Sequence, residues 1–288
     1  MDTTYLTSRF GRTAVGTRSD RPLTNDEIAE VAPSIFALSA HESRSERYTY
    51  IPTSDVLDGL RKEGFQPFMA CQTRVRADDK RAHTKHMVRL RHADQITGRE
   101  ANEIILLNSH DGSSSYQMLA GMFRFVCQNG MVCGDTIGDI RVPHKGDVVG
   151  QVIEGAFKVL DSFEAATHQR EGMAGLALTN GEQTAFARAA LALRYDDEKP
   201  APITEQQLLT PHRMEDRGPD LWTTFNRVQE NMINGGLRGR NANGRPTTTR
   251  AVTGIDQNIR LNRALWVLAD ELCRLRGADR CARPSGRA

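Results

Sequence analysis

The most constraining feature of this sequence is a change in hydrophobic period near Pro143. From Phe65 to about His144, apolar residues alternate or run continuously between turn signals, as they do in strands. From Val149 onward they recur every three or four residues, as on one face of a helix. Strands followed by helices predict an α+β fold with one antiparallel sheet and a helical C-terminal half.

The predicted sheet is built on a basic hairpin. Segments 65–76 and 81–92, separated by the turn ADDK, alternate like two antiparallel strands, and 102–110 follows as a buried strand. Between Gln72 and Arg99, eight lysines and arginines stand against three aspartates, a net charge of +5.

Strand geometry predicts how these cations are grouped, because alternate residues share a face. Arg74 and Arg76 fall on one face of the first strand, and Lys85, Arg89 and Arg91 on one face of the second. Such a face repels itself unless an anion lies across it, and phosphate is the simplest candidate. A hairpin charged to prevent edge-to-edge aggregation is the alternative.

A second basic segment lies between Gly235 and Arg263, with six arginines, no lysine and one aspartate, a net charge of +5. Glycine, asparagine and threonine dominate its first half and favour a mobile polar loop. Guanidinium groups match phosphate oxygens, so this loop is predicted to clamp a nucleic-acid backbone. The residues predicted to do so are Arg238, Arg240, Arg245 and Arg250. A solvated surface loop is the alternative.

Four regions are expected along the chain: a flexible arm over 1–23, an α+β core over 24–200, a helical region with the arginine loop over 201–276, and a disordered tail over 277–288. The motif TNDE, from Thr24 to Glu27, predicts a capping box at the start of the first helix. Trp222 and Trp266 lie in amphipathic segments and are expected in the core.

Composition excludes several classes of function. The 288 residues carry a formal net charge of only +2, so any electrostatic function depends on how charge is distributed. No apolar run approaches the roughly 20 residues that span a bilayer, and the N-terminus lacks the apolar stretch of a secretory signal. We therefore expect a cytoplasmic protein that does not associate with membranes.

Catalytic motifs are scarce. Walker A, GxGxxG and GxSxG patterns are absent, and the five cysteines fit neither a redox pair nor a zinc site. No cofactor or metal is expected, and a non-catalytic role is favoured. A metal-dependent nuclease using Asp111, Asp135 and Asp139 is the alternative, although turn formation explains Asp135 and Asp139 more simply.

Four segments are distinctive when taken together: FQPFMACQTRVR, HMVRLRH, EIILLNSHDGSSSYQMLAGMFRFVCQNGMVCGD and GLRGRNANGRPTTTRAVTGIDQNIRLNRALW. With these segments the sequence resembles a family of uncharacterised phage- and plasmid-borne proteins of the YfjQ and YubP type. The resemblance implies no reaction, but it implies mobile elements whose DNA often enters cells single-stranded. A basic sheet followed by a long helix is also similar in outline to single-strand annealing proteins of the Rad-fifty-two-like group.

These observations predict a single-stranded DNA-binding protein, a recombination annealase that works as a homo-oligomeric ring or filament. In this interpretation the basic sheet is the floor of a groove and the arginine loop is its lid. A protein-binding anti-defence factor directed at a host enzyme is a third hypothesis.

Overall fold

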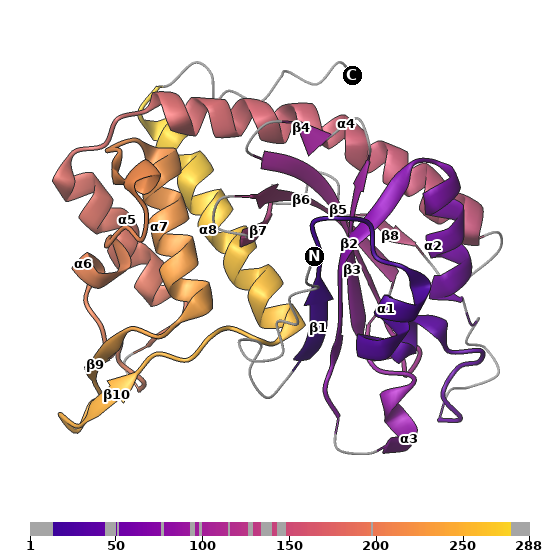
Figure 1. The fold of residues 1–288 in the computed structure, drawn as a ribbon. Coiled ribbons are helices and arrows are strands. Elements are labelled where there is room, and N and C mark those ends of the chain that lie inside the picture. The colour runs from indigo at the N-terminus through magenta and orange to yellow at the C-terminus, as the bar shows by residue number, and fades with distance from the viewer. Residues whose placement is uncertain are drawn as a thin grey trace. The chain divides into compact units, whose positions relative to one another are not determined.

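A computed structural model describes most of the chain. It covers residues 14–43, 50, 52–75, 78–92, 96–97, 100–114, 116–125, 129–133, 140–142, 148–196 and 198–277. The predicted strand-then-helix order is confirmed, and the fold is α+β (Figure 1).

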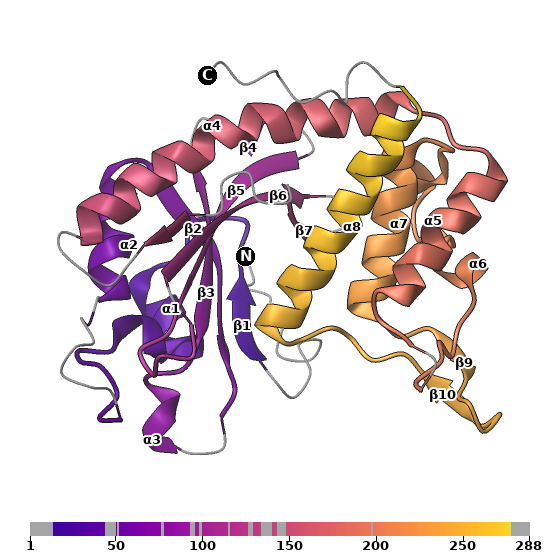
Figure 2. The same cartoon turned by 180° about the vertical axis from the view of Figure 1, so that it is seen from behind.

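The chain divides into two compact units. The sheet unit comprises 1–132, 136–163 and 253–255, and the helical unit comprises 133–135, 164–252 and 256–288. The division therefore falls within helix α4 (Val148–Gly175), whereas the sequence placed it after residue 200. Figures 1 and 2 show the sheet unit mainly in indigo and magenta and the helical unit mainly in orange and yellow.

Within the described residues, the sheet unit is organised around one eight-stranded antiparallel sheet, whose main strand order is β1-β2-β3-β5-β6-β7. Strand β4 pairs with β5, and β8 pairs with β6. The strands are β1 (Ala14–Arg18), β2 (Phe65–Thr73), β3 (His86–His92), β4 (Ile96–Thr97), β5 (Glu100–Asn108), β6 (Tyr116–Arg124), β7 (Asn129–Val132) and β8 (Ile140–Val142).

The predicted basic hairpin corresponds to β2 and β3, with the short helix α3 (Asp78–Arg81) between them. The register shifts between Pro67 and Met69, which is where a residue without a backbone N–H is tolerated in a strand. Beyond this irregularity, Met69 lies opposite Arg89, and Arg89 lies opposite Ile105 on β5.

Strand β1 corrects the expectation of a flexible arm over 1–23. Ala14–Arg18 pairs with β2, and Gly16 lies opposite Cys71. A Cβ atom on Gly16 would lie 2.7 Å from the Cβ of Cys71, so only glycine permits this close approach. The strand was missed because a short segment containing glycine has little hydrophobic alternation. Residues 1–13 lie outside the described residues.

Helices cover one face of this sheet (Figure 2). They are α1 (Asn25–Val31), the 3-10 helix η2 (Pro33–Phe36), α2 (Thr53–Lys62) and the first part of α4. The predicted capping box of α1 is confirmed: Glu27 N–H donates to Thr24 Oγ1, and Thr24 N–H donates to Glu27 Oε2. Helix α4 packs against α2 and β2, with the Phe65 and Phe157 ring centroids 5.7 Å apart.

The helical unit has an aromatic core. Its elements are the second part of α4, α5 (Asn180–Ala192), α6 (Glu205–Leu208), the 3-10 helix η4 (Met214–Arg217), α7 (Leu221–Asn234), β9 (Arg238–Arg240), β10 (Pro246–Thr248) and α8 (Ile255–Leu275). Trp222, Phe225 and Trp266 are buried with centroids 5.6–6.2 Å apart, which confirms that both tryptophans belong to the core.

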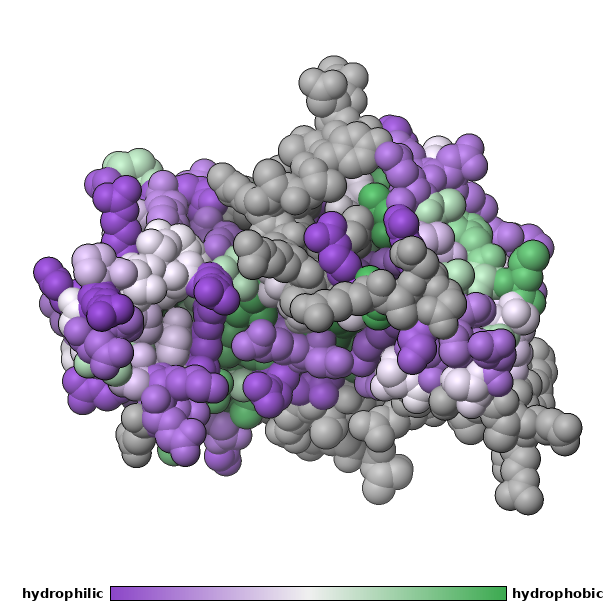
Figure 3. Space-filling view, turned by 90° about the horizontal axis from the view of Figure 1, so that it is seen from below, coloured by the Kyte–Doolittle hydropathy of each residue, from purple (hydrophilic) through white to green (hydrophobic). Residues whose placement is uncertain are grey.

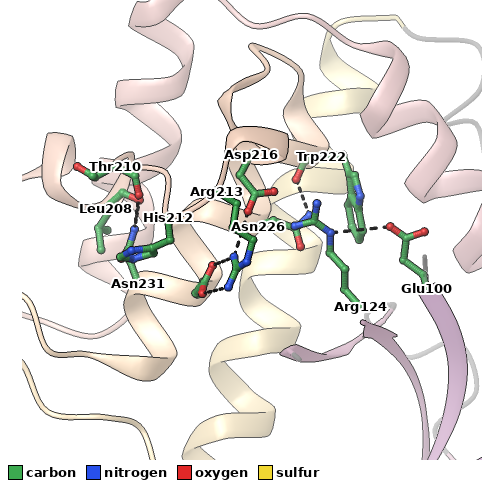
Figure 4. A network of polar contacts seen from close by, with 11 residues as sticks. Glu100, Arg124, Leu208, Thr210, His212, Arg213, Asp216, Trp222, Asn226 and Asn231 are labelled. Carbon is green, nitrogen blue, oxygen red and sulfur yellow. Dashed lines mark hydrogen bonds and ion pairs between the residues drawn. The ribbon is translucent and has the colours of Figure 1, made fainter. Parts of the chain in front are cut away.

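Polar side chains on α7 hold the preceding segment in place (Figure 4). Asn231 Nδ2 donates to the carbonyls of Leu208 and Thr210 at 2.9 and 3.0 Å. Arg213 forms a bidentate pair with Glu230 at 2.6 and 2.7 Å. Because these contacts fix α7, they also fix the starting point of the β9–β10 hairpin that follows it.

Candidate nucleic-acid interface

The arginine-rich segment forms an ordered β-hairpin, which corrects the expectation of a mobile loop. Strands β9 and β10 are antiparallel, with Arg240 opposite Pro246 and Arg238 opposite Thr248. We call residues 237–250 the arginine hairpin. The sequence signal was weak because each strand has only three residues and carries arginine, proline and threonine in place of apolar alternation.

Hydrogen bonds within the connection build its turn. Asn241 Oδ1 accepts from the N–H groups of Asn243 and Arg245, both at 3.0 Å. Gly244 N–H donates to the Asn241 carbonyl at 2.8 Å, and the φ of Gly244 is +70°. An asparagine side chain that binds its own backbone and a glycine with positive φ are typical of tight turns.

Main-chain contacts anchor one side of the arginine hairpin. Arg240 N–H donates to the Pro202 carbonyl at 2.9 Å, and a Cβ atom on Gly239 would overlap that carbonyl. The alternation of a strand places the side chains of Arg238 and Arg240 on the opposite face. The anchored face therefore turns both arginines away from Pro202.

A second anchor lies at the base of the hairpin. The Arg194 guanidinium donates to the Met232 carbonyl at 2.5 Å and also to the Arg250 carbonyl. Gly235, with a φ of +61°, packs against the backbone of Arg250 and Ala251, where a Cβ atom would lie within 3 Å. The base is thus held to the end of α7, so the backbone that carries the hairpin arginines is preorganised.

The charge on the arginine hairpin is exposed. Arg238, Arg240, Arg245 and Arg250 are all exposed. Within the described part of the chain, none of the four forms an ion pair with a carboxylate. Figure 3 views the molecule from the side on which β9 and β10 lie, and hydrophilic residues (purple) gather over that end of the helical unit. Such a surface attracts anions, because its arginines form no ion pair with a carboxylate of the described residues.

The sheet arginines, Arg89 and Arg91, have the opposite environment. They are 3% and 1% exposed, and Glu103 on β5, itself 1% exposed, lies between them. Arg89 Nε is 2.6 Å from Glu103 Oε2, and Arg91 Nε donates to Glu103 Oε1 at 2.9 Å. The anion expected across this face is therefore supplied by the protein itself.

Aromatic rings and glycines shape the space around the sheet arginines. The Arg91 guanidinium lies 4.4 Å from the Phe68 centroid and 4.1 Å from the Phe123 centroid. Arg89 Nη2 donates to the Met131 carbonyl at 2.6 Å, and a Cβ atom on Gly130 would overlap the Arg89 guanidinium. Arg89 and Arg91 therefore belong to a buried cluster whose role is structural.

Arg18 on β1 belongs to the same cluster. Its guanidinium lies 4.9 Å from the Phe123 centroid. Desolvation by burial, followed by repulsion from Arg89, lowers the pKa of Arg18 to about 10. Burial likewise raises the pKa of the Cys71 thiol to about 12. Sequence reasoning missed Arg18 and Glu103, because Arg18 was assigned to the arm and the charge count ended at Arg99.

The other predicted sheet residues do not extend this cluster. Arg74 is exposed and follows the end of β2, and Lys85 is half-buried and precedes β3. Arg76 lies outside the described residues. The described residues therefore do not form the single open cationic face that was expected. DNA binding by Arg74, Arg76, Lys85, Arg89 and Arg91 stays a prediction.

The acidic residues of the nuclease hypothesis are not brought together in the part of the chain that is described. Asp111 Oδ1 accepts from Ser113 N–H at 2.9 Å and so closes a turn. Asp135 and Asp139 lie outside the described residues. Among the residues with defined positions, no group of three or more histidine, cysteine or acidic side chains could hold a metal ion.

A buried polar network joins α2 to the sheet. His86 Nδ1 lies 3.1 Å from the Thr84 carbonyl, so this nitrogen carries the proton and donates, while Nε2 accepts from Thr53 Oγ1 at 2.9 Å. Asn108 Nδ2 donates to the same hydroxyl at 3.0 Å. Desolvation and the neighbouring His110 lower the pKa of His86 to about 3, so its ring is neutral. The network is structural, because its members are buried.

The fold and the interface thus define an α+β protein whose helical unit presents an anchored arginine hairpin. The chain belongs to the family described as Domain of unknown function (DUF932), whose model matches residues 40–266. It is 60% identical over 269 residues to UPF0380 protein YfjQ of Escherichia coli (strain K12), covering 93% of this chain and 98% of the relative. UPF0380 protein YafZ of the same organism is 59% identical over the same length and with the same coverage.

The predicted relationship to the YfjQ type is therefore confirmed. No solved structure matches the chain. The outline similarity to single-strand annealing proteins stays a prediction.

Within the described residues, no helix is both long enough and apolar enough to cross a membrane.

Proposed function

We propose that this protein binds single-stranded DNA and promotes the annealing of complementary strands, with the arginine hairpin as its principal contact. The observation that carries the proposal is a preorganised hairpin with four exposed arginines that lack carboxylate partners in the described chain. Guanidinium groups bind phosphate oxygens through paired N–H donors, which makes phosphate the favoured ligand.

Strand geometry supports a contact to successive phosphates. Arg238 and Arg240 point to the same side of β9. Their Cα atoms are separated by two strand residues, or about 6.6 Å at ~3.3 Å per residue. This spacing is comparable with that of neighbouring phosphates along one extended strand. A contact of this kind is independent of base sequence and leaves the bases accessible for pairing.

The proposal includes three further elements. The protein acts without chemical catalysis, and it assembles into a homo-oligomer because one hairpin covers only a short length of DNA. It works in the cytoplasm, where DNA of mobile elements is single-stranded on entry. Residues 74–91 contribute to DNA binding less than the hairpin does, because Glu103 already neutralises the sheet arginines.

The test is a salt titration of single-stranded DNA binding by fluorescence anisotropy. The double variant Arg238→Ala with Arg240→Ala removes two phosphate contacts. We expect the slope of log affinity against log salt to flatten by about 1.4, at ~0.7 per phosphate on a single strand. Mixed-sequence and homopolymer strands should lose affinity equally, because phosphate contacts carry no sequence information.

Arg217→Ala is the matched control, since Arg217 is an exposed arginine of the same unit outside the hairpin. It should leave the salt slope near that of the wild type. A wild-type chain with no affinity for single-stranded DNA at low salt would overturn the proposal, and a stable protein partner would then favour the anti-defence hypothesis. Strand annealing measured by fluorescence quenching tests the second half of the proposal, and no acceleration over free strands would remove it.

A further inference from the structure

The arginines of the hairpin are not equivalent. Arg240 Nη1 donates to the Gly244 carbonyl at 2.7 Å, which fixes its guanidinium against the turn. The Asn241 side chain is engaged by backbone N–H groups of the turn. Within the described residues, the side chain of Arg245 makes no hydrogen bond or ion pair, and it is exposed where the turn meets β10. Figures 1 and 2 show the two strands extending away from α5 and α7 of the same unit.

The hairpin lacks the side chains that favour single strands over duplexes. Residues 237–250 contain no aromatic side chain, so the hairpin has no platform on which an unstacked base could rest. A duplex, in contrast, carries one negative charge per ~1.7 Å of its axis, twice the density of either strand alone. The exposed charge of the hairpin therefore suits a duplex at least as well as a single strand.

The dimensions of the hairpin limit which part of it could enter a minor groove. Two strands ~4.8 Å apart, with their side chains, are too wide for a minor groove of ~6 Å, but one extended arginine fits there. A narrow A·T-rich minor groove has an enhanced negative potential that attracts inserted arginines. The register that pairs Arg240 with Pro246 places Arg245 on the other face of the hairpin from Arg238 and Arg240, so its groove contact is separate from their phosphate contacts.

We propose that Arg245 inserts into the minor groove of duplex DNA, so that the arginine hairpin also holds the annealed product. This inference rests on the proposed function and deepens it. It assigns two roles within one hairpin: Arg238 and Arg240 bind phosphates of any strand, whereas Arg245 responds to the shape of a duplex groove. The hairpin then favours A·T-rich duplexes without reading their sequence base by base.

The test measures the full chain against three labelled probes of equal length: an A-tract duplex, a G·C duplex and a mixed-sequence single strand. The wild type should bind the A-tract duplex about threefold to tenfold more tightly than the G·C duplex, a difference typical of one groove contact. Arg245→Lys keeps the charge but replaces the planar guanidinium by a strongly hydrated ammonium. We expect it to abolish the A-tract preference, while the affinities for the G·C duplex and for the single strand change by the same small factor.

The control variant is Arg238→Ala, which should weaken binding to all three probes by a similar factor. A ligand that occupies the minor groove should displace the wild type from the A-tract duplex but should not affect its single-strand binding. Equal wild-type affinity for both duplexes, or an Arg245→Lys variant that keeps the preference, would overturn the groove assignment alone. No binding to any probe would instead overturn the proposed function, and the groove assignment with it.

Discussion

Arginines serve opposite purposes in the two regions of this molecule. On the sheet, Arg89 and Arg91 are buried and share one buried carboxylate, Glu103. On the hairpin, Arg238 and Arg240 are exposed and project from a face without a carboxylate partner in the described chain. The sequence segments that contain them, 72–99 and 235–263, have the same net charge. Local charge therefore identifies where arginines are, but only the register of neighbouring strands shows whether they are neutralised.

Substitutions in the two regions should also differ in how much they lower the stability of the fold. Removing one partner of a buried ion pair leaves an uncompensated charge in a poorly solvated place, which strongly destabilises a fold. Removing an exposed, unpaired arginine costs little stability, within about 0.5 kcal/mol at most surface positions. Sheet variants should therefore change folding, and hairpin variants should change binding.

The largest expected effect comes from Glu103→Gln, which removes the carboxylate that pairs with both sheet arginines in the described structure. We expect the free energy of unfolding to fall by about 3–5 kcal/mol, as is typical of broken buried pairs. Chemical denaturation followed by circular dichroism measures this loss. Glu205→Gln is the matched control, because Glu205 pairs with Arg188 at the surface and should cost at most ~1 kcal/mol. Equal losses in the two variants would contradict the comparison.

Acid should weaken the sheet unit next. The pKa of His86 is lowered from 6.5 to about 3 in the folded protein, so below pH 6.5 the unfolded chain takes up a proton that the folded chain does not. Stability is complete above pH 6.5 and falls towards pH 3 by up to about 1.4 kcal/mol per pH unit. Thermal melts across this window measure the slope. His86→Gln should flatten it, whereas His168→Gln, at an exposed position, should not.

A smaller loss is expected from Gly130→Ala. Its new Cβ atom would overlap the Arg89 guanidinium and force this side chain to move, at a cost of about 1–3 kcal/mol. Gly175→Ala is the control, because no atom lies within 4 Å of a Cβ at that position. A denaturation midpoint for Gly130→Ala equal to that of Gly175→Ala would show that Arg89 is not confined.

The smallest effect on stability should follow Arg194→Gln, which removes donors to the carbonyls of Met232 and Arg250. We expect a loss of about 0.5–1.5 kcal/mol, typical of hydrogen bonds at a partly buried site. DNA affinity should fall while the salt slope stays constant, because Arg194 positions the hairpin and does not itself bind phosphate. Arg188→Gln on α5 is the control. A slope that flattens in Arg194→Gln would instead indicate a direct phosphate contact.

The fold was more predictable than the environment of its charges. The capping box at Thr24, the basic strand pair and the helical second half follow from periodicity and local hydrogen bonding, which the sequence carries directly. Strand β1 and the β9–β10 hairpin were missed because tertiary pairing, and not their own alternation, holds them in place. Gly16 and Gly239 mark both sites, since each glycine allows another chain segment to approach closely.

The candidate site was predicted in part. The hairpin arginines were identified by composition, and the structure adds the anchors at Arg194 and Pro202 that orient them. The neutralisation of Arg89 and Arg91 was not foreseen, because Glu103 is 14 and 12 residues away in sequence and reaches them only through the pairing of β3 with β5. Contacts of this kind depend on register, which a single sequence does not specify.

The anchor at Pro202 has a consequence for how the hairpin tolerates sequence change. The carbonyl oxygen that receives Arg240 N–H belongs to the backbone, so any amino acid at position 202 would supply it. Position 239, in contrast, accepts only glycine, because the Cβ atom of any other residue would collide with that oxygen. The two positions that form this contact should therefore accept substitutions at very different rates as the sequence diverges. Residue 202 should vary freely, whereas residue 239 should remain glycine.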